Sequence, residues 1–174
     1  MTGIELDDAM KSMRILVDTR EKKNQHILAS FEGRYCPYTA HKLDYGDYAC
    51  EYRLGDSDAV RMDSVAVIER KASLDELAGN ITKHRERFER EFLRAREAGA
   101  KVFLMVESGS DGYDQIQAHR YRSQLPPKAY LNTLFSWQQK YNITISFVSK
   151  KFAGDYIYAT LFMALKNYLL HGGE

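Results

Sequence analysis

The sequence predicts an α/β fold in which a mixed central sheet is flanked by helices. Short apolar strand patterns alternate with helical patterns along the chain, as in layered α/β domains. The segment "KVFLMVES" is apolar almost throughout, which is typical of a strand buried on both faces. A chain of 174 residues with 44% hydrophobic residues suits one domain. We expect a flexible N-terminal lead-in over residues 1–12 and a single domain over residues 13–174.

Six segments have the composition of strands. They are "MRILVDTRE", "RYCPYTAHKL", "DYACEYRL", "SVAVIERK", "KVFLMVES" and "ITISFVSK". Pro37 predicts that the second is an edge strand or a bulged one, because proline cannot donate to a ladder. The turn-rich "GDSDAV" lies between the third and fourth, which predicts an antiparallel pair.

Four segments have helical patterns. The first, "KKNQHILASFEG", stops at Gly33, and the second runs as one helix from a Ser73 cap to Gly99. Pro127 is placed to open the third, and "DYIYATLFMALKNYLL" forms the last, which ends at Gly172 and Gly173. The segment "GSDGYD" is expected to be a loop.

Composition excludes several classes of protein. Cys36 and Cys50 lack the spacing of a metal site, and we expect free thiols in a reducing compartment. The five scattered histidines argue against zinc. No apolar run approaches the roughly 20 residues that span a bilayer, and the N-terminus is unlike a signal peptide. A cytoplasmic protein with no membrane segment is therefore expected. Its net charge of +1 means that any nucleic-acid surface must be local.

Carboxylates occur where three apolar strands end, at Asp18, Asp47 and Glu69. Because side chains alternate along a strand, Glu69 and Lys71 share one face and Arg70 points to the other. Carboxylates from neighbouring strands can together hold Mg²⁺, which prefers oxygen ligands and keeps several waters. Lys71 could then orient or deprotonate an attacking water, or stabilise negative charge on phosphorus.

An isolated Glu-x-Lys pattern has a simpler explanation, a solvated strand end with surface ion pairs. Two features favour a site here. The charges follow a run that reads as buried, where uncompensated charge is costly. Acids also close two other strand-like segments.

Together, "ILVDTRE", "LDYGDY" and "VIERKASLDEL" resemble the nuclease domain of the XPF-type structure-specific endonuclease family. The hallmark of that family is Gly-Asp, then Glu-Arg-Lys, three residues and Asp. Gly46-Asp47, Glu69-Arg70-Lys71 and Asp75 match each element, and the resemblance covers roughly residues 13–170. It implies a restriction-endonuclease-like core that hydrolyses phosphodiester bonds of junction, flap or otherwise branched DNA with Mg²⁺ or Mn²⁺, in DNA repair or recombination.

The resemblance also implies roles for single residues. Asp47 and Glu69 would bind the metal, Lys71 would be the catalytic lysine, and Asp18 and Asp75 would be further active-site carboxylates, with Asp18 a candidate metal ligand. Arg70 and Arg20 would tie the site together by bidentate pairing with these acids.

The chain departs from larger family members in two ways. Those members continue into helix-hairpin-helix modules, and they carry a Gly-Arg-Leu run where this chain has "GNITKHRERFERE". Both departures leave substrate choice open. The compact form is similar to versions from bacteriophages and bacteria, which would place it in a bacterial cell or an infected host.

Two basic segments are candidate DNA contacts, together with Arg20. Lys83, Arg85 and Arg87 lie next to the acid motif, although a charged helix of this kind is also explained by internal ion pairs. Arg120, Arg122 and Lys128 surround Tyr121 in a segment that is either a DNA-contacting loop or ordinary surface.

The last predicted helix is apolar around much of its circumference, so it must be buried in the core or against another subunit. We therefore expect a homodimer, or a heterodimer, formed through the helices of residues 127–170. Two alternatives to an endonuclease of branched DNA remain. One is a non-catalytic DNA-binding or scaffolding subunit, and the other is a nuclease of the same fold that acts on linear duplex ends or RNA.

Overall fold

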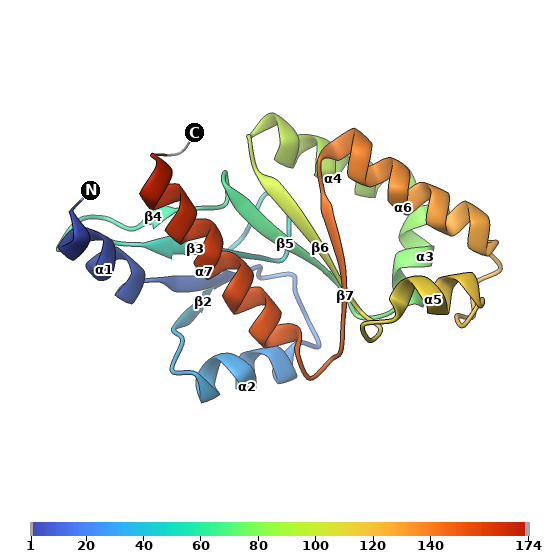
Figure 1. The fold of residues 1–174 in the computed structure, drawn as a ribbon, viewed down its shortest axis with the longest axis horizontal. Coiled ribbons are helices and arrows are strands. Elements are labelled where there is room, and N and C mark those ends of the chain that lie inside the picture. The colour runs from blue at the N-terminus through green and yellow to red at the C-terminus, as the bar shows by residue number, and fades with distance from the viewer. Residues whose placement is uncertain (1, 173–174) are drawn as a thin grey trace.

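The computed structural model describes residues 2–172, in which seven strands form one mixed sheet (Figure 1). The strands are β1 (Arg14–Val17), β2 (Tyr38–Ala40), β3 (Tyr48–Tyr52), β4 (Val60–Arg61), β5 (Ala66–Lys71), β6 (Lys101–Glu107) and β7 (Thr144–Val148). Their order is β2-β1-β3-β5-β6-β7, and β4 pairs with β3. β3 is antiparallel to β1 and β5, whereas β5, β6 and β7 are mutually parallel. The antiparallel pairing predicted for the third and fourth strand segments is confirmed.

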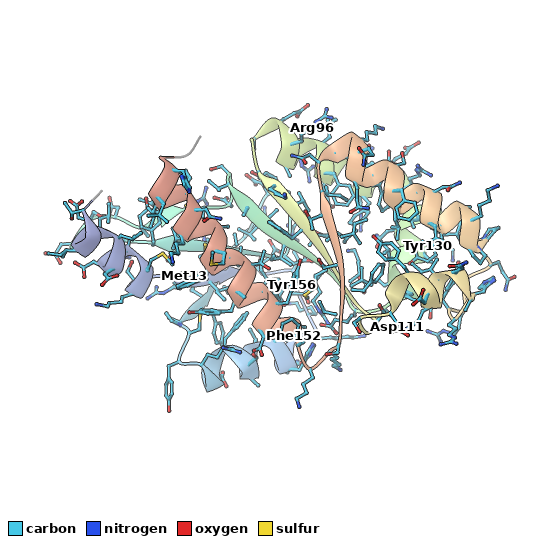
Figure 2. The ribbon with its side chains drawn as sticks, in the orientation of Figure 1. Met13, Arg96, Asp111, Tyr130, Phe152 and Tyr156 are labelled. Atoms are coloured by element: carbon cyan, nitrogen blue, oxygen red, sulfur yellow. The ribbon has the colours of Figure 1, made fainter. Side chains whose placement is uncertain are left out.

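Helices cover both faces of the sheet. They are α1 (Gly3–Lys11), α2 (Gln25–Gly33), α3 (Leu74–Thr82), α4 (Arg85–Glu97), α5 (Gly112–Gln117), α6 (Pro127–Tyr141) and α7 (Ala153–His171). In Figure 1, α1, α2 and α7 lie together on one side, and α3 to α6 lie on the other. Each layer encloses its own apolar core, and Figure 2 labels one residue of each, Met13 under α7 and Tyr130 among α3, α5 and α6. None of the helices within residues 2–172 combines the length and apolarity needed to cross a bilayer.

The N-terminal residues differ from the expected flexible lead-in. Residues 3–11 form α1, which begins with a capping box between Thr2 and Glu5. Ala9 is fully buried, and α1 packs against α7. The sequence signal was the pair of Thr2 and Glu5 three residues apart.

The long helix predicted from Ser73 to Gly99 is two helices, α3 and α4, and the Ser73 cap is confirmed. Thr82 bonds back to the carbonyl of Ala78, which weakens the helix at this point. The break turns α4 so that Phe88 and Phe92 pack against Trp137, with ring centroids 5.4 and 5.5 Å apart. As a result, α3 and α4 each contact both the sheet and α6.

Further predictions concern the ends of helices and the cysteines. Part of the expected "GSDGYD" loop is the start of α5, whereas Pro127 opens α6 as predicted. Gly172 caps α7 in the left-handed region, and Gly173 lies outside the described residues. Cys36 and Cys50 are free, buried thiols, as expected.

Candidate active site

The Gly46-Asp47 pair is placed by close contact with β5. Gly46 has a φ of +73°, and a Cβ on it would lie 2.9 Å from the Cβ of Val67. Only glycine fits such a conformation and such an approach. The turn lets the Asp47 amide donate to the Ile68 carbonyl over 2.7 Å, while its Oδ2 accepts from the Arg70 amide over 2.8 Å. Gly46 thus fixes the Asp47 carboxylate at the carboxyl end of β5.

Four of the predicted site residues project from one face of the sheet. Val67 belongs to the core under α3 to α6, and its neighbours Ala66 and Ile68 belong to the opposite core. Strand alternation then places Glu69 and Lys71 on the face of α3 to α6. Leu16 and Ala49 lie in the same core, so Asp18 and Asp47, each two residues away on strand-like backbone, share that face. Asp18 and Asp47 therefore lie on the same face as Glu69 and Lys71, the pair for which the sequence predicted a common face.

Burial and nearby charges shift the pKa values of Asp47, Glu69 and Lys71. The Nζ of Lys71 lies 2.6 Å from Oε1 of Glu69, and both side chains are buried. Burial, together with the nearby charge of Glu69, raises the pKa of Asp47 well above its usual value. Burial also raises the pKa of Glu69, although Lys71 opposes it. For Lys71, burial is outweighed by Glu69 and Asp47, so its pKa is raised and it stays protonated at neutral pH.

Asp47 and Glu69 fit a hard divalent cation. Oδ1 of Asp47 and Oε2 of Glu69 accept no hydrogen bond within residues 2–172, whereas the other oxygen of each is occupied. Two carboxylate oxygens are enough for Mg²⁺, which keeps several waters. Added positive charge would also favour the ionised form of both carboxylates, which burial opposes. No cluster of three or more His, Cys, Asp or Glu side chains suited to a metal occurs among the described residues, so a third ligand from Asp18 stays a prediction.

Asp18 is occupied by other partners. Its two oxygens accept four hydrogen bonds, from the Arg20 amide and guanidinium and from the Leu43 amide, over 2.7 to 3.1 Å. Burial opposes ionisation, but these bonds hold the pKa of Asp18 below its usual value. The bidentate pairing expected of Arg20 is therefore present, and Asp18 holds Arg20 and Leu43 together.

Arg70 pairs with acids that were not predicted as site residues. Its Nε lies 2.7 Å from Glu107 and its Nη1 lies 2.6 Å from Glu21. His26 on α2 also reaches Glu107, at 2.9 Å. These side chains form a network on the face opposite Lys71, in which Arg70 and Glu107 are buried and Glu21 and His26 are partly buried. The expectation that Arg70 pairs its guanidinium with Asp18, Asp47, Glu69 or Asp75 is corrected, since only its backbone amide bonds one of them, Asp47.

The signal for Glu107 was present in the sequence. Glu107 closes "KVFLMVE" as Glu69 closes "VAVIE", and the two strands are parallel neighbours. Parallel strands place their carboxyl ends at one edge, so an acid there belongs beside the site.

Asp75 anchors the basic segment that follows α5. Its Oδ1 accepts from the amides of Arg122 and Ser123, and its Oδ2 from Nε of Arg122. Both oxygens are thus directed at the loop. Glu76, the next residue, lies nearer the centre, with Oε1 4.0 Å from Nζ of Lys71.

Two substitutions of Asp75 test whether its side chain anchors the segment of Arg122 and Ser123. In Asp75→Asn the amide oxygen can still accept from the Arg122 and Ser123 amides, whereas Asp75→Ala leaves both without that acceptor. We expect hydrogen exchange at these two amides to speed up about tenfold in the alanine variant and to change little in the asparagine variant. Equal effects in both variants would contradict the anchoring role.

The other predicted DNA contacts are exposed, and they lie at the end of α3, on α4, after α5 and on α6. Arg85 pairs with Glu89 over 2.8 Å, as expected for a charged helix. Lys83, Arg87, Arg120 and Lys128 are exposed and form no ion pair within the described chain, while Phe88 and Phe92 are core residues. The Nζ of Lys71 lies 4.7 Å above the Phe88 ring, so α4 borders the site.

Comparisons with known proteins agree with this geometry. Residues 17–160 match the ERCC4 domain. The fold is similar to that of XPF from Aeropyrum pernix, with a TM-score of 0.60 and 22% identity over 86% of this chain. XPF of the same organism in complex with DNA gives 0.62 and 21% over 88%. This chain spans 66% of the length of each of those structures. No curated protein sequence matches it. The predicted restriction-endonuclease-like fold is confirmed.

Proposed function

Because the chain belongs to the ERCC4 domain family and carries an XPF-type nuclease domain, we propose that it is a divalent-metal-dependent endonuclease of branched DNA. The observation that carries the proposal is the meeting of Asp47, Glu69 and Lys71 on one face, with two carboxylate oxygens left without hydrogen bonds. A folding role alone does not explain buried carboxylates with raised pKa values, because each costs stability. The structure of XPF from Aeropyrum pernix in complex with DNA supports DNA as the nucleic acid that is bound.

The chain's residues divide the work of hydrolysis. Oδ1 of Asp47 and Oε2 of Glu69 would hold Mg²⁺ or Mn²⁺, which when bound supplies Lewis-acid activation of water and charge neutralisation at the phosphate. Protonated Lys71 stabilises the negative charge that develops on phosphorus, and its bond to Glu69 holds it in place. Arg70 positions Asp47 through its backbone amide.

The test is cleavage of matched oligonucleotides by the purified chain. We expect single-strand incision of flap, fork or four-way junction DNA with Mg²⁺ or Mn²⁺, and none when EDTA replaces the metal. A linear duplex of the same sequence and an RNA copy serve as controls. Binding without cleavage of any substrate would support a non-catalytic subunit, and preferential cutting of RNA or linear ends would support a nuclease with a different substrate.

We also propose that two copies associate along α7. A hollow of about 1120 Å³ lies between α7 and the starts of β5 and β6, lined by Phe103, Ala159 and Met163 among others. Met163 and Leu170 are about half exposed, which is unusual for large apolar side chains on a solvated helix. A second copy would bury this surface and would also double the area available to hold a branched DNA.

Met163→Glu should prevent this association, because it places a charge in an apolar contact. Light scattering at tens of micromolar should give the mass of a dimer for the wild type and of a monomer for the variant. Lys150→Glu, exposed in the turn before α7 and outside the hollow, should remain dimeric. A wild type that is monomeric at this concentration and fully active would contradict the proposal.

A further inference from the structure

A second hollow lies beside the candidate active site. It encloses about 410 Å³ between residues 42–45 and helix α4, and its lining includes three cationic side chains, Arg20, Lys42 and Arg94, and one acid, Asp44. We call it the basic pocket. The cations come from three separate parts of the chain, which the fold brings together around one space.

Two of the three cations, Arg20 and Arg94, are held in place by hydrogen bonds. Arg20 is fixed by Asp18 and by the Leu43 carbonyl, 2.7 Å from Nη2. Arg94 donates from Nη2 to the Asp44 carbonyl over 3.2 Å. Neither Lys42 nor Arg94 forms an ion pair within residues 2–172. The acids near the pocket, Asp18, Asp44 and Glu91, equal the cations in number. Within the described chain, Lys42 and Arg94 nevertheless remain without a carboxylate partner, so both are available to an anionic ligand.

The basic pocket adjoins the candidate active site through the backbone. Asp44 precedes Asp47 by three residues, so their Cα atoms lie at most about 11 Å apart. The backbone amide of Asp18 also donates to the Asp47 carbonyl over 2.8 Å. Asp18, which fixes Arg20, therefore lies next to the proposed metal ligand Asp47. Arg94 lies on α4, the same helix whose Phe88 contacts Lys71. The pocket therefore opens on the catalytic side of the sheet.

We infer that the basic pocket binds a backbone phosphate of the DNA close to the phosphate that is cut. The inference rests on the proposed function. Guanidinium groups recognise phosphate oxygens by paired hydrogen bonds, and such contacts fix the register of a strand without reading its sequence. Asp18 then acts as a positioning residue, because it sets Arg20 for this contact.

The test maps the contacted phosphate directly. Single phosphates of a branched DNA are replaced in turn by neutral methylphosphonates, and affinity is measured by fluorescence anisotropy in EDTA, so that the metal-dependent cleavage cannot occur. For the wild type, we expect a loss on the order of tenfold at one or two positions near the branch. In Arg94→Gln and Lys42→Gln the same replacement should cost less than about twofold, because the contact is already absent.

Arg96→Gln is the matched control. Arg96 is exposed on the same helix, but its guanidinium bonds the Lys140 carbonyl away from the basic pocket. It should keep the wild-type profile. Glutamine has a helix propensity close to that of arginine, so each variant should fold, which circular dichroism confirms.

The outcomes separate the inference from the proposed function. If the wild type shows phosphate-sensitive positions and both pocket variants retain every one of them, the basic pocket does not bind DNA and the inference is overturned. Unchanged affinity and salt dependence in those variants would overturn the inference as well. If the wild type does not bind DNA at all, the proposed function fails with it.

Discussion

Lys71→Ala should lower the rate of DNA cleavage by at least about 10²-fold while DNA binding persists, because it removes a fixed positive charge from the reacting phosphate. Metal binding should be retained or improved, since the lysine no longer repels a cation beside Glu69. The measurements are single-turnover cleavage, DNA affinity, and the rise in melting temperature on adding Mg²⁺.

Lys166→Ala provides the control for this substitution, because Lys166 is an exposed lysine on α7 that is far from the site in sequence and fold. It should cleave as the wild type does. A folded Lys71→Ala protein with a near-wild-type rate would show that the lysine only neutralises Glu69.

Glu107→Ala should lower the free energy of unfolding by about 3–5 kcal/mol, because it leaves the buried Arg70 without its main partner. The side chains of Glu107 and Arg70 are 3% and 5% exposed, so solvent screens the pair little. Glu107→Gln keeps a hydrogen-bond acceptor and should lose less. Urea denaturation at pH 7 measures both, and a loss below about 1 kcal/mol in the alanine variant would contradict the role of the network.

The stability that Glu107 contributes should depend on pH, which the comparison of wild type with Glu107→Gln measures. Burial of Glu107 opposes ionisation, but the bonds from Arg70 and His26 hold its pKa below the usual value. Its stabilisation is therefore complete above about pH 4.3, the value for an unfolded chain, and is lost as the pH falls through the lowered pKa. The difference in stability between wild type and Glu107→Gln should shrink between pH 5 and the acid limit of folding. A constant difference over that range would exclude this linkage.

The sequence predicted the centre of the site because a strand has a strict period of two. Once Val67 was assigned to a buried strand, the opposite faces of Lys71 and Arg70 followed. The Gly-Asp motif of the family then identified Asp47 as a site residue. The structure explains the position of Asp47 by the positive φ of Gly46.

Partners of long side chains could not be predicted in the same way. Asp18 and Asp75 lie where the motif places acids, yet their oxygens are taken by Leu43 and by Arg122, 25 and 47 residues away. Local pattern carries no information on such contacts, which depend on how loops pack in three dimensions. The break between α3 and α4 is similar, because no proline or glycine stands at the break and the contact of Phe88 with Trp137 on α6 is not local in the sequence.

Glu69→Gln tests the central claim most directly, because it keeps the size of the side chain and removes the charge proposed to hold the metal. The measurement is the single-turnover rate on branched DNA with Mg²⁺, for a variant shown to be folded and to bind that DNA. We expect a fall of at least 10²- to 10³-fold. A rate close to that of the wild type would mean that the end of β5 is not the active site.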